Sequence, residues 1–399
     1  LIKKTVELST VIRNLAPGAD IYGPMFFGWT DAYRWGLTQS EWDKIRLDEN
    51  YKSKYSWFVD YYLDTLHKVE QETGHRAIDA IAFHWYPESF GATTKKRIVD
   101  LDGTSTQSDL VKEDMITARL QAPRGLWDSK YTYLGNDGKS SYVCTQGGKA
   151  ILSKIKASVD KFYPGTKIAF TEFEYDAENH WSGGLCLADV LGVLGREDVY
   201  LACKWDVFQS YSIAAYNLYL NYDGKGNKYG TTSVYATQSD TVAISSFASL
   251  DDEKNLHIIA INKTNEAQNT SFEIENGIYS NGVVYGFDKN TSDINYIGTI
   301  DEFQNSTFSY SLPAYSALHF ILNAVPQTTL AKAQVVEPNH DEILLTFEDN
   351  ISSTASLEDL KGDFAVTINE TEYTVNSILI SGNTLTIKLD GEISSSDNN

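Results

Sequence analysis

Residues suited to chemistry cluster between Lys167 and Gly184, in the sequence KIAFTEFEYDAENHWSGG. A short apolar run, Ile168–Phe170, leads into Glu172 and a segment rich in carboxylates and aromatic rings. A buried strand that ends in a carboxylate is how (β/α) barrels present a catalytic acid at their C-terminal rim. Carboxylates beside Trp, Tyr and His indicate glycoside chemistry, which ordinarily needs two carboxylates. The pattern predicts that Glu172 is one of them.

Two further predicted strand ends carry residues that complement Glu172. His84, Trp85 and Tyr86 close one strand, and Trp205 closes another. A carboxylate nucleophile needs a neighbour that fixes its rotamer and keeps it ionised, which a hydrogen bond from Tyr86 or His84 would do. Trp rings suit stacking on pyranose rings, and all eight Trp residues lie within the first 205 residues. The strand ends therefore predict a sugar-binding site.

Composition argues against several classes of function. With 33 basic and 54 acidic side chains, the 399-residue chain has a formal net charge of −21. Such a surface repels phosphate backbones, so we expect no nucleic-acid partner. No run of 18 apolar residues is present, so we expect no membrane span. The cysteines lack metal-binding spacing, and the apolar runs around Cys186 and Cys203 predict buried free thiols.

Residues 1–230 alternate between helical and strand patterns, which predicts a parallel α/β sheet. Four strand–helix units correspond to half of a (β/α)8 TIM barrel, and we expect its C-terminal half. Half a barrel has two open edges and an exposed inner face, so it should not be stable alone. The expected helices cover 1–16, 57–72, 109–120, 150–162, 182–194 (with Ser182 as N-cap) and 213–222, and the expected strands 20–27, 78–85, 167–172 and 199–205.

The remainder of the chain has an all-β pattern. Short alternating segments separated by Gly, Asn and Asp predict an antiparallel β-sandwich over residues 231–325. A further, partial β module is expected over 326–399. The expected strands are 241–249, 256–262, 270–274, 282–286, 306–311 and 315–322 in the sandwich, and 343–347, 365–368, 371–380 and 384–389 in the module.

The motifs at these strand ends resemble glycoside hydrolase family 44. The sequence TEFEY…NHWSGG…ADVLGVLGREDVYLACKW is similar to the family's nucleophile region. Further similar motifs occur in the family's order, and the resemblance runs from about residue 1 to 322. These motifs are YGPMFFG (22–28), FHWYPE (83–88), ARLQAPRGLWD (118–128), FYPGTK (162–167) and NYDGKG (221–226).

The resemblance implies a secreted, extracellular bacterial endo-β-1,4-glucanase or xyloglucanase with a (β/α)8 barrel and a β-sandwich. The family hydrolyses with retention, and its nucleophile, the Glu of a TEY-type motif, corresponds to Glu172. The implied partner is β-1,4-glucan or xyloglucan, bound by a monomer that requires no cofactor. The expected substrate-binding residues are His84, Trp85, Tyr86, Trp127, Glu174, Tyr175, His180 and Trp205.

One departure from the family concerns the general acid/base. In the family this residue is the Glu of an Asn-Glu-Pro motif, which precedes the helix with which this chain opens, and no Asn-Glu-Pro occurs here. We therefore expect residue 1 to be a truncation point and the chain as given to be inactive. Glu88 and Glu174 are alternative acids, but neither sits on the required neighbouring strand.

A second departure is Glu174, where family members usually carry Asn. A like charge two residues from Glu172 would raise a pKa in the pair. Alternatively, Glu174 binds a substrate hydroxyl or a cation, or is a solvated loop acid. No metal site is predicted, although a structural Ca²⁺ is compatible with the acidic loops that contain Asp176, Glu178, Asp223 and Asp252.

Two other functions stay open at the level of sequence. The chain could be a non-catalytic polysaccharide-binding protein that keeps an aromatic cleft, or a retaining mannanase or β-glucosidase of the same barrel clan. The segment TINETEYTVNSILISGNTLTIKL resembles the Ig-like modules that secreted bacterial enzymes carry after a catalytic domain. That resemblance predicts a partial Ig-like module and gives it no assigned role.

Overall fold

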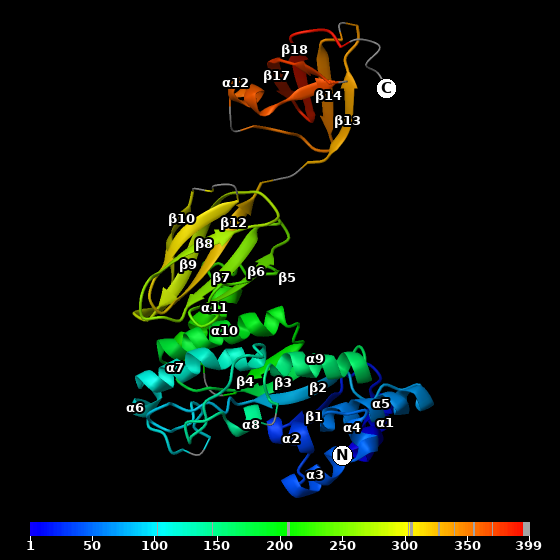
Figure 1. Ribbon diagram of the computed structural model, residues 1–399, viewed down its shortest axis with the longest axis vertical. Helices are drawn as coiled ribbons and strands as arrows, with labels where there is room; N and C mark the ends of the chain where they lie inside the picture. The colour runs from blue at the N-terminus through cyan, green and yellow to red at the C-terminus, as the bar shows by residue number, and fades with distance from the viewer. Residues whose placement is uncertain are drawn as a thin grey trace. The chain divides into compact units, whose positions relative to one another are not determined.

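The computed structural model divides the chain into two compact units, Leu1–Ala324 and Val325–Asn399 (Figure 1). The predicted boundary at residues 230/231 lies inside the first unit and stays a prediction. No described helix has both the length and the apolarity needed to cross a membrane. The structure describes residues 1–101, 103–145, 147–205, 208–301, 303, 306–325, 328–338, 340–353, 356–368 and 370–393.

The first unit contains a parallel four-stranded sheet in the order β1-β2-β3-β4. The α/β pattern of the sequence is thereby confirmed in this region, whereas closure of the sheet into a barrel stays a prediction. The strands are β1 Tyr22–Phe26, β2 Ala80–Trp85, β3 Lys167–Phe173 and β4 Leu201–Lys204.

Among the described residues, the longer helices that accompany these strands lie close to where periodicity predicts them. They are α1 Ile2–Leu15, α5 Phe58–Thr73, α7 Glu113–Gln121, α9 Ile151–Phe162, α10 Trp181–Arg196 and α11 Ser210–Leu220. Shorter helices fill the connections: α2 Trp29–Arg34, α3 Gln39–Arg46, α4 Glu49–Lys52, α6 Gln107–Leu110, η1 Ala122–Leu126 and α8 Tyr142–Thr145.

Two predicted helix boundaries are wrong for local reasons. The expected helix over 109–120 is two helices, because α6 stops at Leu110 and α7 starts at Glu113. Helix α10 starts one residue earlier than expected, since His180 rather than Ser182 is its N-cap. The His180 side chain accepts the backbone N–H of Ser182, which lies inside the helix.

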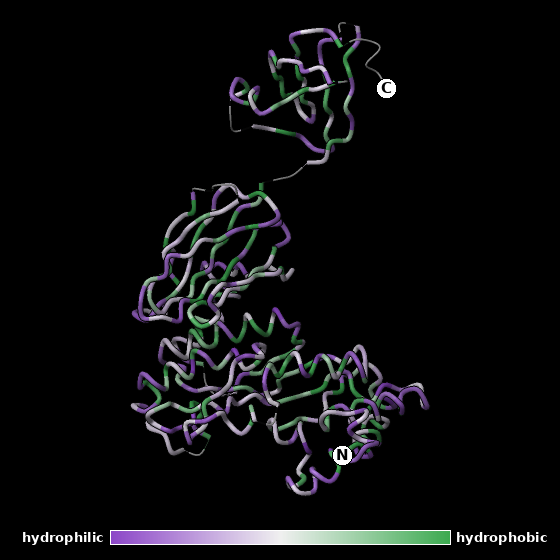
Figure 2. Tube along the Cα trace, in the orientation of Figure 1, coloured by the Kyte–Doolittle hydropathy of each residue, from purple (hydrophilic) through white to green (hydrophobic). Residues whose placement is uncertain are grey.

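The two faces of the parallel sheet differ in side-chain size. Large residues such as Phe83 and Phe170 face a core shared with α5, α9 and α10. The other face carries Ala80, Ala82 and Ala169. Figure 2 shows the hydrophobic colour following β2, β3 and much of α10. Cys203 of β4 is exposed, contrary to prediction, whereas Cys186 is buried in α10 as predicted.

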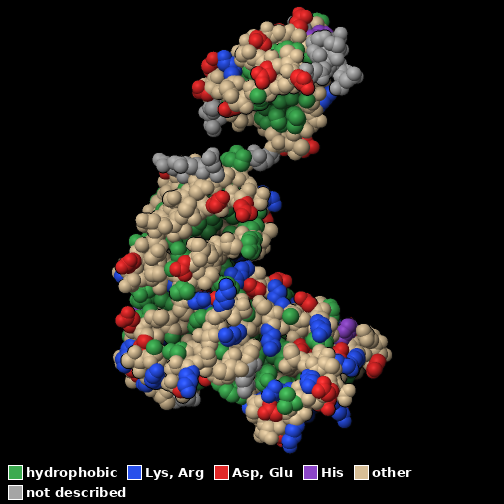
Figure 3. All heavy atoms as spheres, viewed as in Figure 1, with side chains coloured by type: hydrophobic (Ala, Val, Ile, Leu, Met, Phe, Trp, Pro, Cys, Tyr) green, Lys and Arg blue, Asp and Glu red, His purple; other side chains and the backbone are tan. Residues whose placement is uncertain are grey.

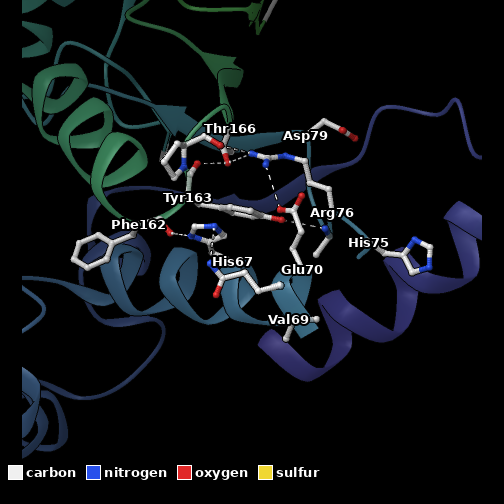
Figure 4. A network of polar contacts seen from close by, with 12 residues as sticks. His67, Val69, Glu70, His75, Arg76, Asp79, Phe162, Tyr163 and Thr166 are labelled. Carbon is white, nitrogen blue, oxygen red and sulfur yellow. Dashed lines mark hydrogen bonds and ion pairs between the residues drawn. The ribbon is translucent and has the colours of Figure 1, made fainter. Parts of the chain in front are cut away.

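The loop that leads into β3 is fixed around Tyr163, as Figure 4 shows. The Arg76 guanidinium lies 4.1 Å over the Tyr163 ring and donates to Thr166 Oγ1 at 2.6 Å. His67 stacks on the same ring with centroids 5.3 Å apart. Tyr163 and Thr166 of the FYPGTK segment therefore have a structural role. They anchor the N-terminal end of β3, opposite the end that carries Glu172.

The β region of the first unit contains a six-stranded antiparallel sheet, β10-β9-β12-β7-β6-β5, and a two-stranded sheet, β11-β8. Stacked rings of Phe272 and Phe308 and the adjacent Phe320 join the two sheets in one core. The strands are β5 Thr232–Val234, β6 Ile244–Leu250, β7 Leu256–Asn262, β8 Gln268–Glu273, β9 Tyr279–Asp288, β10 Thr291–Ile300, β11 Thr307–Leu312 and β12 Ser316–Ala324.

Helix α10 joins the parallel sheet to the six-stranded sheet. Gly192 of α10 lies so close to Phe247 of β6 that an added Cβ would meet that ring at 2.2 Å. Phe247, Ile259 and Phe287 belong to the same buried cluster as the core of the parallel sheet. The continuous core explains why residues 1–324 form one compact unit rather than two.

The second unit has its own small core. Its main sheet has the order β13-β14-β18-β17, and β15 pairs with β16. The strand expected over 371–380 is divided at Thr374, because β16 pairs with β15 whereas β17 pairs with β18. The Ig-like assignment stays a prediction. Elements are β13 Leu330–Val335, β14 Glu342–Phe347, α12 Leu357–Leu360, η2 Lys361–Asp363, β15 Val366–Ile368, β16 Thr371–Tyr373, β17 Val375–Ser381 and β18 Thr384–Leu389.

A buried ion pair crosses the contact between α10 and the six-stranded sheet. Lys263 Nζ lies 3.5 Å from Asp189 Oδ2, and the two side chains are 1% and 2% exposed. Ser245 Oγ donates to the same Asp189 oxygen at 2.9 Å and accepts from Lys263 Nζ at 2.9 Å. In contrast, the face in Figure 3 shows exposed acidic and basic side chains interspersed over the first unit.

Replacing Lys263 with Met should lower the free energy of unfolding by about 3–5 kcal/mol, because Asp189 would stay buried without a cation. Urea denaturation of the chain at pH 7 measures this loss. The double variant K263M/D189N should recover most of it. A loss below about 1 kcal/mol, as is typical of exposed pairs, would show that the pair does not stabilise this contact.

Candidate active site

The C-terminal end of β3 contains a β-bulge. Phe83 pairs with Phe170, yet the next residue, His84, pairs with Glu172. On the other side, Phe170 pairs with Ala202 and Phe173 with Lys204, so that β3 again uses one residue more than its neighbour. Phe170 and Phe173 both face the helix-side core. The extra residue therefore turns Glu172 away from that core, toward the alanine face of the sheet.

The Glu172 carboxylate is held by residues from the end of β2. The Tyr86 hydroxyl donates to Glu172 Oε2 at 2.6 Å. His84 Nδ1 lies 3.1 Å from the same oxygen but outside hydrogen-bond geometry. Burial, followed by the bond to Glu172, raises the pKa of Tyr86, so that the hydroxyl keeps its proton and acts as a donor. This pairing of adjacent strand ends is the arrangement predicted for a carboxylate whose rotamer is fixed by a neighbour.

Phe27 is a site residue that sequence reasoning missed. It follows β1, is 64% exposed, and its ring centroid lies 6.0 Å from that of His84 and 6.3 Å from that of Tyr86. The available signal was a large apolar residue between a strand end and Gly28. A cavity of about 190 Å³ adjoins these rings; its lining includes Phe27, Thr30, Asp31, Tyr86, Glu88 and Arg97.

A buried charge cluster lies beside Glu172, formed by Glu174, Glu178 and Lys204. The Lys204 ammonium donates to Glu174 Oε2, and to Glu178 Oε1 at 3.0 Å. All three side chains are buried, with exposures of 3%, 7% and 2%. Glu174 Oε1 also accepts the backbone N–H groups of Tyr175 and Asp176 at 2.6 and 2.7 Å. The interpretation of Glu174 as a solvated loop acid is therefore wrong.

The pKa values of the two carboxylates of this cluster are shifted in opposite directions. Burial and the neighbouring Glu178 raise the pKa of Glu174 to about 8. Burial also acts to raise the pKa of Glu178, but hydrogen bonds with Glu174 and Lys204 lower it overall. With Glu174 protonated, Glu178 ionised and Lys204 as an ammonium, the three groups are together electrically neutral, which suits their burial.

The acidic loops differ in their suitability for a cation. Ligand oxygens of Glu174, Asp176 and Glu178 lie within 4.8 Å of one another. Lys204 already supplies a positive charge to two of them, so these residues fit an internal ion cluster better than Ca²⁺. Asp223 accepts backbone N–H groups of its own turn, and Asp252 belongs to no such cluster among the described residues.

Three predicted aromatic contacts occupy different positions around Glu172. Trp85 is 4% exposed, and its Nε1 donates to the Tyr133 hydroxyl at 3.3 Å, which places the ring beneath the site. Tyr175 is 1% exposed and also belongs to the core. Trp205 follows β4 and is 58% exposed, so it alone of these three offers a broad face to a ligand.

The structure does not bring Trp127 to the site. The Arg196 guanidinium lies 4.6 Å over the Trp127 ring, at the C-terminal end of α10. His180 caps the opposite end of this helix, about 22 Å away at 1.5 Å per residue. His180 is half-buried, and burial lowers its pKa to about 4, so it is neutral at pH 7. The two predicted residues therefore belong to different regions of the molecule.

Neither alternative acid is poised for proton transfer. Glu88 Oε2 lies 3.2 Å from the Arg97 guanidinium, and Glu174 is engaged by Lys204 and two backbone N–H groups. A general acid must present its proton to a leaving group in an open cleft. The described residues thus provide a held carboxylate, Glu172, together with exposed aromatic rings.

Comparison with known proteins finds similarity to glycoside hydrolases. Residues 1–89 match the model of glycoside hydrolase family 44. The chain is 36% identical over 375 residues to endoglucanase A of Paenibacillus lautus, covering 92% of this chain and 49% of that protein. It is 37% identical over 330 residues to β-mannanase/endoglucanase A of Caldicellulosiruptor saccharolyticus, covering 80% and 24%. The chain thus spans about half the length of the first relative and about a quarter of the second.

Solved structures of family 44 enzymes are also similar to this chain. A family 44 xyloglucanase from Paenibacillus polymyxa matches with a TM-score of 0.71 and 37% identity, over 81% of this chain and 60% of that one. Cel44A, a family 44 endoglucanase from Clostridium thermocellum, matches with a TM-score of 0.71 and 36% identity over the same shares.

The raised pKa of Glu174 predicts a specific pH dependence. The pKa of Glu174 is raised from 4.5 to about 8, so folding retains a proton that the unfolded chain releases above about pH 4.5. The stability it contributes is full below that pH and is lost as the pH rises through 8. Relative to E174Q, the wild-type melting temperature should therefore fall between pH 5 and 8.5. If the melting temperatures of wild type and E174Q change with pH in parallel, Glu174 does not hold this proton.

Proposed function

We propose that this chain, which belongs to glycoside hydrolase family 44, carries the nucleophile of a retaining endo-β-1,4-glucanase acting on cellulose-type glucan and xyloglucan. The observation that carries the proposal is the Glu172 carboxylate, turned out of the core by the β3 bulge and held at 2.6 Å by the Tyr86 hydroxyl. The proposed reaction class follows from the names of the relatives, among which one xyloglucanase structure is a complex with xyloglucan.

In the proposed mechanism Glu172 attacks the anomeric carbon. Tyr86 and His84 both approach Oε2, so we assign the attack to Oε1. The glycosidic bond breaks as the Glu172–sugar ester forms, and a general acid protonates the leaving oxygen. Water, deprotonated by the same residue, then cleaves the ester and restores the original anomeric configuration.

The general acid/base is proposed to lie outside these 399 residues. In retaining enzymes its carboxyl group is roughly 5–5.5 Å from the nucleophile. Within the described part of the chain, Glu88 and Glu174 are held by ion pairs with Arg97 and Lys204. We infer that the chain alone does not hydrolyse β-glucan and that the complete gene product does. We also infer a secreted, monomeric bacterial enzyme.

Substrate choice within the β-glycans stays open, and one relative is named a β-mannanase as well as an endoglucanase. Hydrolysis by the complete gene product should be compared on xyloglucan, carboxymethylcellulose, mannan and xylan. A product that binds these polymers but hydrolyses none would favour the alternative of a polysaccharide-binding protein.

Replacing Glu172 with Gln in the complete gene product should lower kcat by about 10⁴-fold or more, because the covalent step is lost. Binding of cellulose oligomers, measured by calorimetry, should be spared. Azide should restore turnover to E172A and yield a glycosyl azide of inverted configuration. The control is E70Q, which should keep wild-type kcat, because Glu70 of α5 pairs with Arg76 at the opposite end of the sheet (Figure 4). Retained activity in E172Q would exclude Glu172 as the nucleophile.

The paired variants W205A and W127A test the placement of the aromatic residues. Trp205 is 58% exposed at the end of β4, so its loss should raise KM for long oligosaccharides with little change in kcat. Trp127 packs under Arg196, and its loss should leave KM unchanged even if stability falls. Steady-state kinetics of the complete gene product measures both, and equal KM values for the two variants would contradict this placement.

A further inference from the structure

The segment that follows β2 folds back on itself. Phe90 forms an antiparallel bridge with Arg97. The backbone N–H of Ile98 donates to the carbonyl oxygen of Ser89 at 2.9 Å. We refer to residues 86–98 as the β2 loop. Because of this reversal, Arg97 near the end of the loop lies beside the residues at its start.

Arg97 binds three consecutive residues at the start of the β2 loop. Its Nε donates to the carbonyl oxygen of Pro87 at 3.0 Å, and its Nη2 donates to the carbonyl oxygen of Tyr86. Nη2 also lies 3.2 Å from Glu88 Oε2. A planar guanidinium presents several donors in one fixed geometry, which a lysine ammonium does not reproduce. The contacts therefore fix the main chain at Tyr86 as well as a side chain.

The main chain at Tyr86 determines where its hydroxyl lies. The ring extends rigidly from that backbone to Glu172 Oε2, and the bond of 2.6 Å closes the connection. Hydrogen bonds of this type weaken steeply with misalignment. A shift of about 1 Å in a positioning contact costs on the order of 10²-fold in rate. Movement of the β2 loop would therefore displace the Tyr86 hydroxyl from the Glu172 carboxylate.

We propose that Arg97 is a positioning residue, which holds the carbonyl oxygens of Tyr86 and Pro87 so that the Tyr86 hydroxyl is set against Glu172. The role in catalysis rests on the proposed function of Glu172. Arg97 acts through Tyr86 and does not itself touch the reacting atoms.

The β2 loop contains a second anchor that serves as a matched control. At its tip, Asp114 of α7 accepts the backbone N–H groups of Thr93 and Thr94 at 2.8 and 2.7 Å. It also accepts the Thr94 hydroxyl at 2.9 Å. Loss of Asp114 should loosen the loop tip and lower stability, yet leave the Arg97 contacts with Tyr86 in place.

The kinetic test compares R97M, R97K and D114N in the complete gene product. R97M should lower kcat by about 10- to 100-fold with KM changed less than about threefold, and R97K should recover only part of the loss. D114N should lower the melting temperature but keep kcat. Added guanidinium should partly restore kcat in R97A. A kcat for R97M equal to that of D114N would overturn the proposal.

A second test uses the complete gene product and needs no activity. With tyrosine labelled by ¹³C at Cζ, the Tyr86 signal is assigned by its loss in Y86F, and E172A gives its position without the carboxylate acceptor. R97M should move the signal toward that of E172A, whereas D114N should not. An unchanged signal in R97M overturns the positioning role. If the complete gene product hydrolyses no β-glycan, the proposed function fails while this measurement still decides the role of Arg97.

Discussion

One extra residue in β3 is the constraint on which the site depends. Phe170 and Phe173 both belong to the helix-side core, although they are three positions apart. In a regular strand that spacing would put them on opposite faces and would turn Glu172 into the core. The bulge satisfies both demands, because the apolar rings stay buried and the carboxylate emerges beside His84 and Tyr86. The bulge thus keeps the apolar rings in the core without burying the Glu172 carboxylate there.

Two sets of buried charges in this unit are balanced locally. Glu174, Glu178 and Lys204 reach neutrality by retaining one proton. Asp189 and Lys263 reach it as a direct pair. Each set joins two elements, the first linking the ends of β3 and β4, the second linking α10 to the six-stranded sheet. Buried ions are costly unless they are paired, so each set permits only a narrow range of arrangements of the elements that it joins.

The sequence predicted the positions of helices and strands better than it predicted which way their side chains face. Apolar runs located all four parallel strands, and the residue types after them located Glu172 and its donor Tyr86. Periodicity did not reveal the bulge, because bulges depend on neighbouring strands. Trp127 was expected at the site because its motif occurs among the other motifs along the sequence. In the folded chain it packs instead under Arg196. Strand β10 was missed because it is mostly exposed and lacks apolar alternation. The bulge, the position of Trp127 and strand β10 all depend on contacts with other elements, which the local sequence does not show.

The alanine face of the parallel sheet gives a physical basis for the barrel prediction. Ala80, Ala82 and Ala169 extend only a methyl group above the sheet, whereas the helix side is filled by phenyl and indole rings. Tyr22 of β1 and Leu201 of β4 pack against these buried alanines. In a closed barrel, side chains from the other strands complete the layers on such a face. His84 and Glu172 stand at the C-terminal edge of this same face. A layer packed on the alanines would bound the cleft over Glu172, which is where a second carboxylate is required for glycoside hydrolysis.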